Sequence, residues 1–340
     1  MEHIAIDLGG KESQICIRSQ EGKILEERRV GTRDLRKVLS RPAGRVLLET
    51  CTEAFAVAEL AMAQGHEVRV VPATLVRGLG VGSHGVKTDI KDARVLSEAS
   101  CRMDLPSVHV PASRTREVKA CCGMRDGLVR SRRALVNAVR AWLRGRVVRL
   151  RRRGAESFPE RVRALFLIEG QEVPTYVERH LRAIELLNEE IGQADAEIEE
   201  HAEASGVCRR LMTVPGVGPQ TALRFVAALD ELERFSGSHQ VESYLGLTPG
   251  ENSSSERKRR TSITKAGSTE VRWLLVQAAW SALRTHGVHP MLDWARGIAA
   301  RRGKRIAVVA LARKLAGILY ALWRDGTSYQ AGRAAQKVVQ

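Results

Sequence analysis

Four acidic side chains in the first hundred residues have the spacing of a metal site. Asp7 follows the apolar segment HIAI, and Glu49 ends the apolar run RVLLE. Asp89 and Asp92 stand three residues apart in KTDIKDARVL, so on a helix they share a face. Carboxylates that meet raise one another's pKa unless cations neutralise them, and Mg²⁺ prefers such oxygen ligands.

Two Mg²⁺ ions held in this way can stabilise the attacking and leaving oxygens of a phosphoryl transfer. The pattern predicts such a site on Asp7, Glu49, Asp89 and Asp92, with Mn²⁺ able to substitute for Mg²⁺. Each acid alone also fits a structural role, as a turn cap, a surface acid at a strand end or an acid at a helix N-terminus.

The segments around these acids predict the elements that would hold them. Alternating or short apolar runs indicate strands, and the spacing of Ala56, Leu60 and Ala63 indicates a helix that ends at Gly65. The expected strands cover residues 3–8, 12–19, 23–29, 45–50 and 66–72, and the helix covers 53–64. Three strands followed by alternating helix and strand predict a mixed α/β sheet.

Positive charge is concentrated in residues 114–163, which carry 16 Arg and Lys against four acids, so that 16 − 4 = +12 of the chain's +16 lies there. The stretch reads as helical, with an apolar stripe of Leu128, Leu135, Val139, Trp142 and Leu143. Such a density of cations favours nucleic acid as a partner. The alternative is a solvated basic helix without a partner. The candidate contacts are Arg130, Arg132, Arg133, Arg140 and Arg144.

Residues 172–204 carry apolar side chains at spacings of three, four and seven, interrupted by Asn188 and Asp195. This pattern is typical of a coiled-coil-like or antiparallel helix pair, which could also mediate self-association. The rest of the chain, from residue 206, reads as helices joined by short turns.

The segment VPGVGPQTA resembles a helix-hairpin-helix turn, in which backbone N–H groups near Gly216 and Gly218 can bind a phosphate. An ordinary turn between helices needs the same glycines. A second polar segment, residues 246–267, contains Ser253, Ser254 and Ser255, and its basic residues are Arg257, Lys258, Arg259, Arg260 and Lys265. A serine hydroxyl becomes a nucleophile only when it is activated, and nearby cations can stabilise charge on a phosphate. A plain solvated loop would have the same composition.

Other classes of protein fit less well. The six cysteines show neither a disulfide framework nor zinc-ligand spacing. No uninterrupted apolar run approaches the roughly 20 residues of a membrane span, and the N-terminus lacks the features of a signal peptide. We therefore expect no membrane partner and a soluble, intracellular protein.

The acids and the C-terminal motifs together resemble a known family. Asp7, Glu49 in LLET, and KTDIKDARVL are similar to the acidic tetrad of RuvC-like nuclease domains. Over roughly residues 3–325 the chain resembles transposases of the insertion-sequence family numbered one hundred and ten. The resemblance implies an RNase H/RuvC-like mixed sheet within residues 1–150, a helical spacer over 151–205, and a mainly α-helical transposase domain over 206–330. Residues 331–340 are expected to form a disordered tail.

The same resemblance implies that Asp7, Glu49, Asp89 and Asp92 bind the metal and that Ser254 is the nucleophile. Ser255 stands where the family usually has glycine, so Ser253 and Ser255 remain candidates. Because the acids and the serine fall in different domains, they would meet within one chain or across subunits.

The implied function is a DNA transposase or recombinase that excises and inserts a mobile element. Its serine attack, assisted by Mg²⁺, would give a covalent protein–DNA intermediate. A non-coding RNA from the element would guide it, and dimers would assemble to tetramers. One alternative is a RuvC-like structure-specific endonuclease acting by metal-dependent hydrolysis. Another is a basic nucleic-acid-binding protein without activity. A sugar-kinase-type ATPase also starts with a segment like IAIDLGG, but the chain lacks a convincing second phosphate loop.

Overall fold

The computed structural model describes residues 1–340 except 79–88, 152, 252–259, 286–288 and 332–340. The chain divides into two compact units, unit 1 (Met1–Ala112) and unit 2 (Ser113–Gln340). The long basic helix that begins at Ser113 therefore belongs to unit 2 by its contacts, whereas the sequence grouped it with the first domain; the domain boundary at 150 stays a prediction. The expected tail lies, apart from Ala331, outside the described residues.

Unit 1 is built on a five-stranded mixed sheet in the order β3-β2-β1-β4-β5, which confirms the predicted fold class. β1 pairs antiparallel with β2 and parallel with β4, while β2 pairs antiparallel with β3 and β4 pairs parallel with β5. The strands are β1 (His3–Asp7), β2 (Glu12–Arg18), β3 (Ile24–Gly31), β4 (Arg45–Glu49) and β5 (Glu67–Val71). Each lies within two residues of a predicted strand.

Helices cover both faces of this sheet. They are α1 (Leu35–Leu39), α2 (Ala54–Ala63), α3 (Ala73–Gly78) and α4 (Asp89–Arg102), with a 3-10 turn η1 (Thr32–Asp34). Because side chains alternate along a strand, Ile4 and Ile6 pack in one apolar cluster with α1 and α2, and Ala5 packs in the other with Leu96 and Ala99 of α4.

Helix α4 is fastened to the sheet by hydrogen bonds along its C-terminal half. His3 Nδ1 and Ser100 Oγ lie 2.7 Å apart, and Arg18 Nε donates to Ser97 Oγ at 3.1 Å. Ser97 Oγ also donates to Cys16 Sγ at 3.3 Å. These contacts place the C-terminal end of α4 over the start of β1, so the helix runs antiparallel to that strand.

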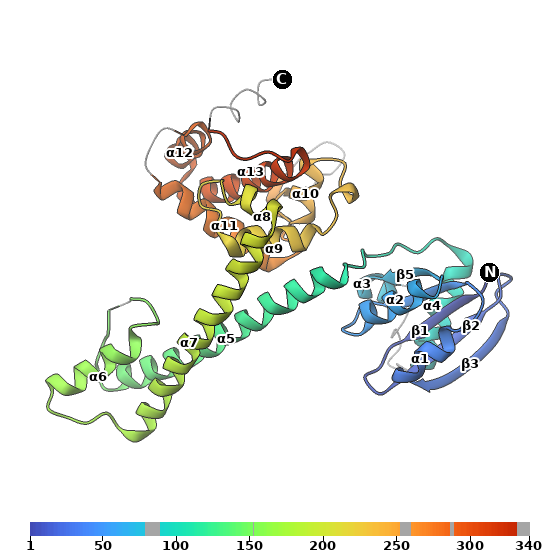
Figure 1. Ribbon diagram of the computed structural model, residues 1–340, viewed down its shortest axis with the longest axis horizontal. Helices are drawn as coiled ribbons and strands as arrows, with labels where there is room; N and C mark the ends of the chain where they lie inside the picture. Colours follow the sequence, from blue (N-terminus) through green and yellow to red (C-terminus); the bar gives the residue numbers. More distant parts are fainter. Residues whose placement is uncertain (79–88, 152, 252–259, 286–288, 332–340) are drawn as a thin grey trace. The chain divides into compact units, whose positions relative to one another are not determined.

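In unit 2, α5 and α7 lie side by side and antiparallel, with α6 at one end of the pair (Figure 1). Their bounds are α5 (Ser113–Gly145), α6 (Phe158–Ile168) and α7 (Thr175–Ala204). The predicted stripe is buried at Val139 and Leu143 and partly buried at Leu128, Leu135 and Trp142. The predicted antiparallel helix pair is thus formed within one chain.

Polar residues of the α7 seam find partners on α5. Arg125 donates to Asp195 at 2.8 and 3.2 Å, and one heptad further along, Arg132 donates to Asn188 Oδ1 at 2.8 Å. The two pairs are seven residues apart on each helix, in opposite directions. The interruptions of the apolar pattern therefore set the register of the pair rather than weaken it.

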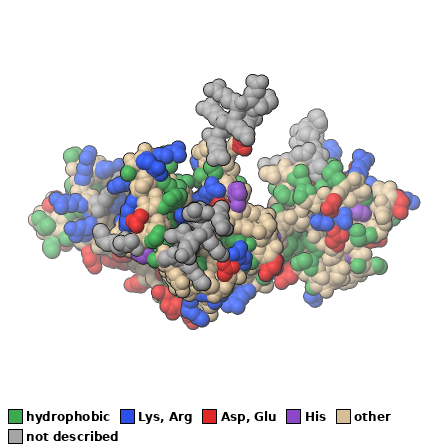
Figure 2. All heavy atoms as spheres, turned by 90° about the horizontal axis from the view of Figure 1, so that it is seen from above, with side chains coloured by type: hydrophobic (Ala, Val, Ile, Leu, Met, Phe, Trp, Pro, Cys, Tyr) green, Lys and Arg blue, Asp and Glu red, His purple; other side chains and the backbone are tan. Residues whose placement is uncertain are grey.

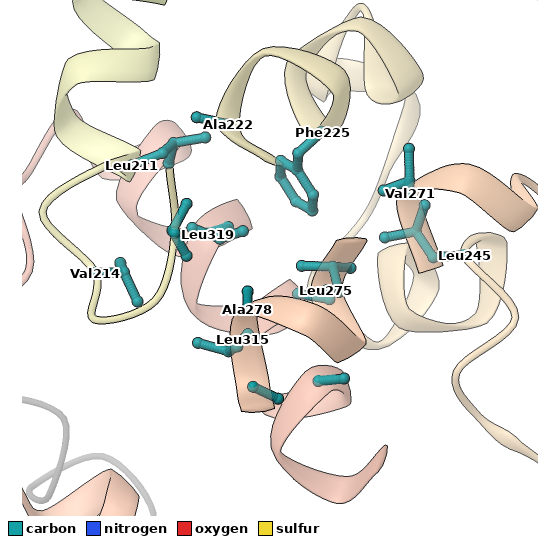
Figure 3. Close-up of a cluster of buried hydrophobic side chains, with 14 of the residues drawn as sticks. Leu211, Val214, Ala222, Phe225, Leu245, Val271, Leu275, Ala278, Leu315 and Leu319 are labelled. Carbon is teal, nitrogen blue, oxygen red and sulfur yellow. The ribbon is translucent and has the colours of Figure 1, made fainter. Parts of the chain in front are cut away.

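The remainder of unit 2 is a helical bundle around one apolar core (Figure 3). Its elements are α8 (Gly206–Leu211), α9 (Pro219–Leu229), η2 (Leu232–Arg234), α10 (Ser238–Tyr244), β6 (Pro249–Glu251), β7 (Arg260–Ile263), α11 (Thr269–Arg284), α12 (Pro290–Arg302) and α13 (Lys304–Asp325). Phe225 of α9 lies among Leu245, Val271 and Leu275 at the centre.

Helix α13 is long and apolar enough to cross a membrane by composition alone. In the structure it is instead a core helix, because Leu311, Leu315 and Leu319 are fully buried in the bundle. Its Arg313 also donates to Glu242 of α10 at 2.5 Å. The helix is accounted for by packing in unit 2.

The turn between α8 and α9 places its two glycines in different surroundings. Gly216 has φ +84° and lies against α11, where a Cβ atom would come within 2.2 Å of the Ala278 carbonyl oxygen. Gly218 has φ −101°, and a Cβ there would meet nothing within 4 Å. Pro219 opens α9, as the sequence predicts. Close packing against α11 and the positive φ therefore explain why position 216 is glycine.

These surroundings predict unequal effects on stability. Gly216→Ala should destabilise unit 2 by about 2 kcal/mol or more, from left-handed strain and the clash with α11, and lower Tm by roughly 5 °C. Gly218→Ala, in the same turn, should change Tm by no more than about 1 °C, the scale of a neutral surface change. Thermal unfolding of both variants checks this, and equal losses would contradict the packing argument.

The anchor at His3 predicts a pH dependence. Burial, followed by the positive charge of Arg45, lowers the pKa of His3 from the ordinary 6.5. Below pH 6.5 the unfolded chain takes up a proton that the folded chain resists, so stability falls until the pH passes the folded-state pKa. His3→Gln, which cannot titrate, should flatten the decline in Tm between about pH 7 and pH 5. The exposed His239→Gln is the control and should keep the wild-type slope.

Candidate active site and nucleic-acid interface

The parallel pairing of β1 and β4 brings two of the predicted acids together. His3 pairs with Arg45 and Ile6 with Leu48, so Asp7 and Glu49 occupy the next positions on strands about 4.8 Å apart. Alternation places both on the α4 face of the sheet, the face that carries Ala5. Strands β1 and β4 thus end at the same end of the sheet, and the side chains of Asp7 and Glu49 lie on the same face.

Helix α4 brings the third acid to that edge. From Ser100 back to Asp92 the helix rises about 12 Å, and from His3 to Asp7 the strand advances about 13 Å. Since α4 runs antiparallel to β1 from the His3–Ser100 contact, Asp92 lies level with Asp7. Asp92 is only 5% exposed, so its carboxylate faces the sheet rather than solvent.

Asp89 begins α4, one turn before Asp92, but its side chain lies outside the described residues. The structure therefore brings Asp7, Glu49 and Asp92 to one end of the sheet, and for Asp89 it gives the backbone position alone. These carboxylates are hard oxygen donors, and the set fits Mg²⁺ better than a metal that prefers sulfur or imidazole.

A hydroxyl network that the sequence analysis did not identify supports the turn after Asp7. Thr32 Oγ1 donates to the Gly9 carbonyl at 2.6 Å and lies 2.8 Å from Ser13 Oγ, which in turn accepts from Gly9 N at 3.4 Å. A Cβ at Gly9 would come within 2.3 Å of the Glu12 carbonyl oxygen. The chain direction after Asp7 is therefore fixed by close contacts. Thr32 is 23 positions after Gly9, so no local pattern in the sequence indicated this network.

The predicted serine segment is carried by the hairpin of β6 and β7. Pro249 pairs with Ile263 and Glu251 with Arg260, so the chain leaves and re-enters the hairpin at neighbouring positions. The segment between the two strands contains the predicted residues Ser253, Ser254, Ser255, Arg257, Lys258 and Arg259, which all lie outside the described residues. Lys265 is exposed, has φ +58° and donates its backbone N–H to the Gly246 carbonyl at 3.1 Å.

The root of this hairpin is held by Arg272 of α11, a residue that the sequence analysis missed. Its buried Nη1 donates to the Ala266 carbonyl at 2.8 Å and to the Leu245 carbonyl at 3.1 Å, so one guanidinium joins both arms. Gly246 and Gly267 let the arms approach closely, with φ +68° and +71°. Only the tertiary structure brings these segments to Arg272, so no local pattern could have found it.

The five predicted arginines of α5 are not equivalent. Arg130, Arg133 and Arg144 are exposed, whereas Arg132 donates to Glu156 at 2.9 Å as well as to Asn188, and Arg140 lies 5.3 Å from the centre of the Phe158 ring. Figure 2 shows Lys and Arg side chains gathered over the α5–α6 end of unit 2. A basic surface is therefore present, although part of the charge serves the fold.

Comparison with known proteins gives two family matches and full-length relatives. Residues 4–147 match the DEDD transposase family of IS110, and residues 208–291 match the family described as "Transposase IS116/IS110/IS902 family". The transposase for insertion sequence element IS1111A of Coxiella burnetii is 30% identical over 97% of this chain and 91% of its own length. The transposase for IS1328 of Yersinia enterocolitica is 28% identical over 96% and 98%. The chain therefore belongs to the IS116/IS110/IS902 family of transposases.

Proposed function

We propose that this transposase moves its element by serine attack on DNA, with Asp7, Glu49, Asp89 and Asp92 as its metal-binding acids. The main support for the proposal is that Asp7, Glu49 and Asp92 lie at one end of the sheet. Mg²⁺, or Mn²⁺ in its place, would supply charge stabilisation at the scissile phosphate when bound. Two ions are the expected number.

The steps at the phosphate are carried out by residues of the chain itself. Ser254 Oγ forms a bond to phosphorus, the bond from phosphorus to a deoxyribose oxygen breaks, and the serine proton passes to the leaving DNA hydroxyl. A DNA hydroxyl from the other strand then attacks the serine phosphodiester and reverses these exchanges. Because every phosphodiester lost is regained, no external energy source is needed. Arg257, Lys258, Arg259 and Lys265 stabilise charge on the phosphate.

Nucleic acid is bound by the basic surface of α5 and the turn at Gly218. Arg130, Arg133 and Arg144 are exposed and suit phosphate contacts, as does the open N-terminus of α9. We propose that an element-encoded RNA guides the protein, so that base pairing selects donor and target DNA. The protein would then act in the bacterial cytoplasm at the nucleoid.

Self-association into dimers and tetramers is part of the proposal. The seam of α7 is used within one chain, so a second copy must bind elsewhere. Exposed apolar side chains at the α6–α7 end offer such a surface, namely Leu167, Ile168, Tyr176 and Leu186.

The decisive experiment uses DNA with both element ends, Mg²⁺ and the cognate RNA. Ser254→Ala should abolish the covalent protein–DNA adduct seen on a denaturing gel while binding persists. Asp92→Asn should lower strand cleavage by roughly 10²–10³-fold, the scale for losing one charge-stabilising group. Asp104→Asn, an exposed acid of the same unit, should cleave normally.

Other outcomes of this experiment separate the competing proposals. If the adduct survives Ser254→Ala but not Ser253→Ala or Ser255→Ala, the nucleophile is the neighbouring serine. Cleavage without any adduct favours a RuvC-like endonuclease that hydrolyses DNA directly. If strand cleavage continues after Mg²⁺ is removed, the proposed metal site is rejected.

The hairpin root gives a further prediction that does not require DNA. Loss of the Arg272 guanidinium leaves the buried carbonyl of Leu245 and the partly exposed carbonyl of Ala266 without this donor, at a cost of ~1–3 kcal/mol. Arg272→Met should therefore speed hydrogen exchange at the amides of Thr264 and Lys265, which close the hairpin. Arg284→Met, an exposed arginine on the same helix, should leave those amides protected. If hydrogen exchange at these two amides is unchanged in Arg272→Met, Arg272 does not hold the root of the hairpin.

A further inference from the structure

A cavity of about 330 Å³ lies in unit 2 between α5, α9 and the root of the β6–β7 hairpin. Lys119 and Arg130 line it from α5, and Arg224 lines it from α9. Tyr244 and Ser268 contribute the wall next to the hairpin. The cavity therefore joins the basic helix to the segment that carries the candidate nucleophile.

The charges that line this cavity do not cancel. Arg224 donates to both oxygens of Asp126 at 2.8 Å, so these two groups neutralise each other. Glu270 is the other acid in the wall, and its carboxylate accepts from Ser268 Oγ at 3.1 Å. Three cations against two acids leave a net charge of 3 − 2 = +1, and the cations outside the Arg224–Asp126 pair are Lys119 and Arg130.

Both remaining cations can accept an anionic partner. In the part of the chain that the structure describes, neither Lys119 nor Arg130 makes a hydrogen bond or an ion pair. The Lys119 side chain is exposed to solvent, yet the atoms packed around its ammonium lower its pKa more than the nearby Asp230 carboxylate raises it. An anion bound beside it would offset that loss of solvation.

We propose that this cavity binds the phosphodiester backbone of the DNA strand on which the hairpin acts, with Lys119 and Arg130 each donating to a phosphate oxygen. The inference rests on the proposed function, since it assigns the strand to the serine hairpin. Ammonium and guanidinium groups in a concave, partly desolvated wall are suited to phosphate oxygens. A volume of about 330 Å³ is near the lower limit for ligand pockets and admits one phosphate with its sugar, not a duplex.

The distance from the cavity to the hairpin loop limits which phosphate it receives. Tyr244 and Ser268 stand at the root, and the arm from Gly246 to Glu251 advances at most about 17 Å, the length it would have if fully extended. At a rise of about 3.4 Å per nucleotide, that length spans roughly five nucleotides. The bound phosphate therefore lies within about five nucleotides of the end of the described hairpin.

Binding of duplex DNA that carries the element end tests the proposal without cleavage. Divalent ions are left out, so the result does not depend on whether Ser254 attacks. Lys119→Gln and Arg130→Gln should each lower affinity several-fold and reduce the slope of log K against log salt by about 0.9. Arg302→Gln removes an exposed cation of α12 and should leave the slope unchanged.

A neutral methylphosphonate placed at successive linkages then locates the phosphate. A methylphosphonate at one of these linkages should weaken binding by the wild type and have no further effect on Lys119→Gln. If no position depends on Lys119, or if Lys119→Gln lowers affinity for RNA and not for DNA, the proposal is overturned. Neither result would change the expected loss of the covalent adduct in Ser254→Ala. The proposal for the cavity and the proposal for the serine nucleophile can therefore fail independently.

Discussion

The register between β1 and β4 is the constraint on which the candidate metal site depends. Because side chains alternate along a strand, a slip of one residue would put Asp7 and Glu49 on opposite faces of the sheet. The pairing of Ile6 with Leu48 is held by apolar cores on both faces, so a slip would also expose one core and bury polar groups in the other. Hydrophobic burial thus sets the position of two carboxylates that contribute nothing to it.

In unit 2, helix α5 packs against α7 with some of its arginines and exposes others to solvent on a different face. Arg125 and Arg132 turn to α7, where their partners Asp195 and Asn188 fix the helix register. Arg130 and other exposed arginines remain for solvent or nucleic acid. A count of positive charge therefore overstates the surface available for phosphate, since part of it is neutralised within the fold.

Much of the fold could be predicted from the sequence, because the elements of unit 1 follow from local periodicity. The strand ends at Asp7 and Glu49 and the helix start at Asp89 are signals of this kind. What escaped prediction depends on residues distant in the chain. Arg272 contacts a carbonyl 27 positions earlier, and Gly216 packs on a helix that starts more than 50 positions later. Neither contact leaves a local trace in composition or spacing.

Both candidate functional segments are held by side chains that bond to backbone carbonyls. Thr32 does so at the turn after Asp7, and Arg272 does so at the root of the serine hairpin. A bond to a backbone carbonyl does not itself select a side chain, so it places few demands on the sequence of the loop beyond it. Arg272 and the ladder from Pro249 to Ile263 act outside residues 252–259. They therefore hold the two ends of the serine segment without depending on which residue stands at position 255.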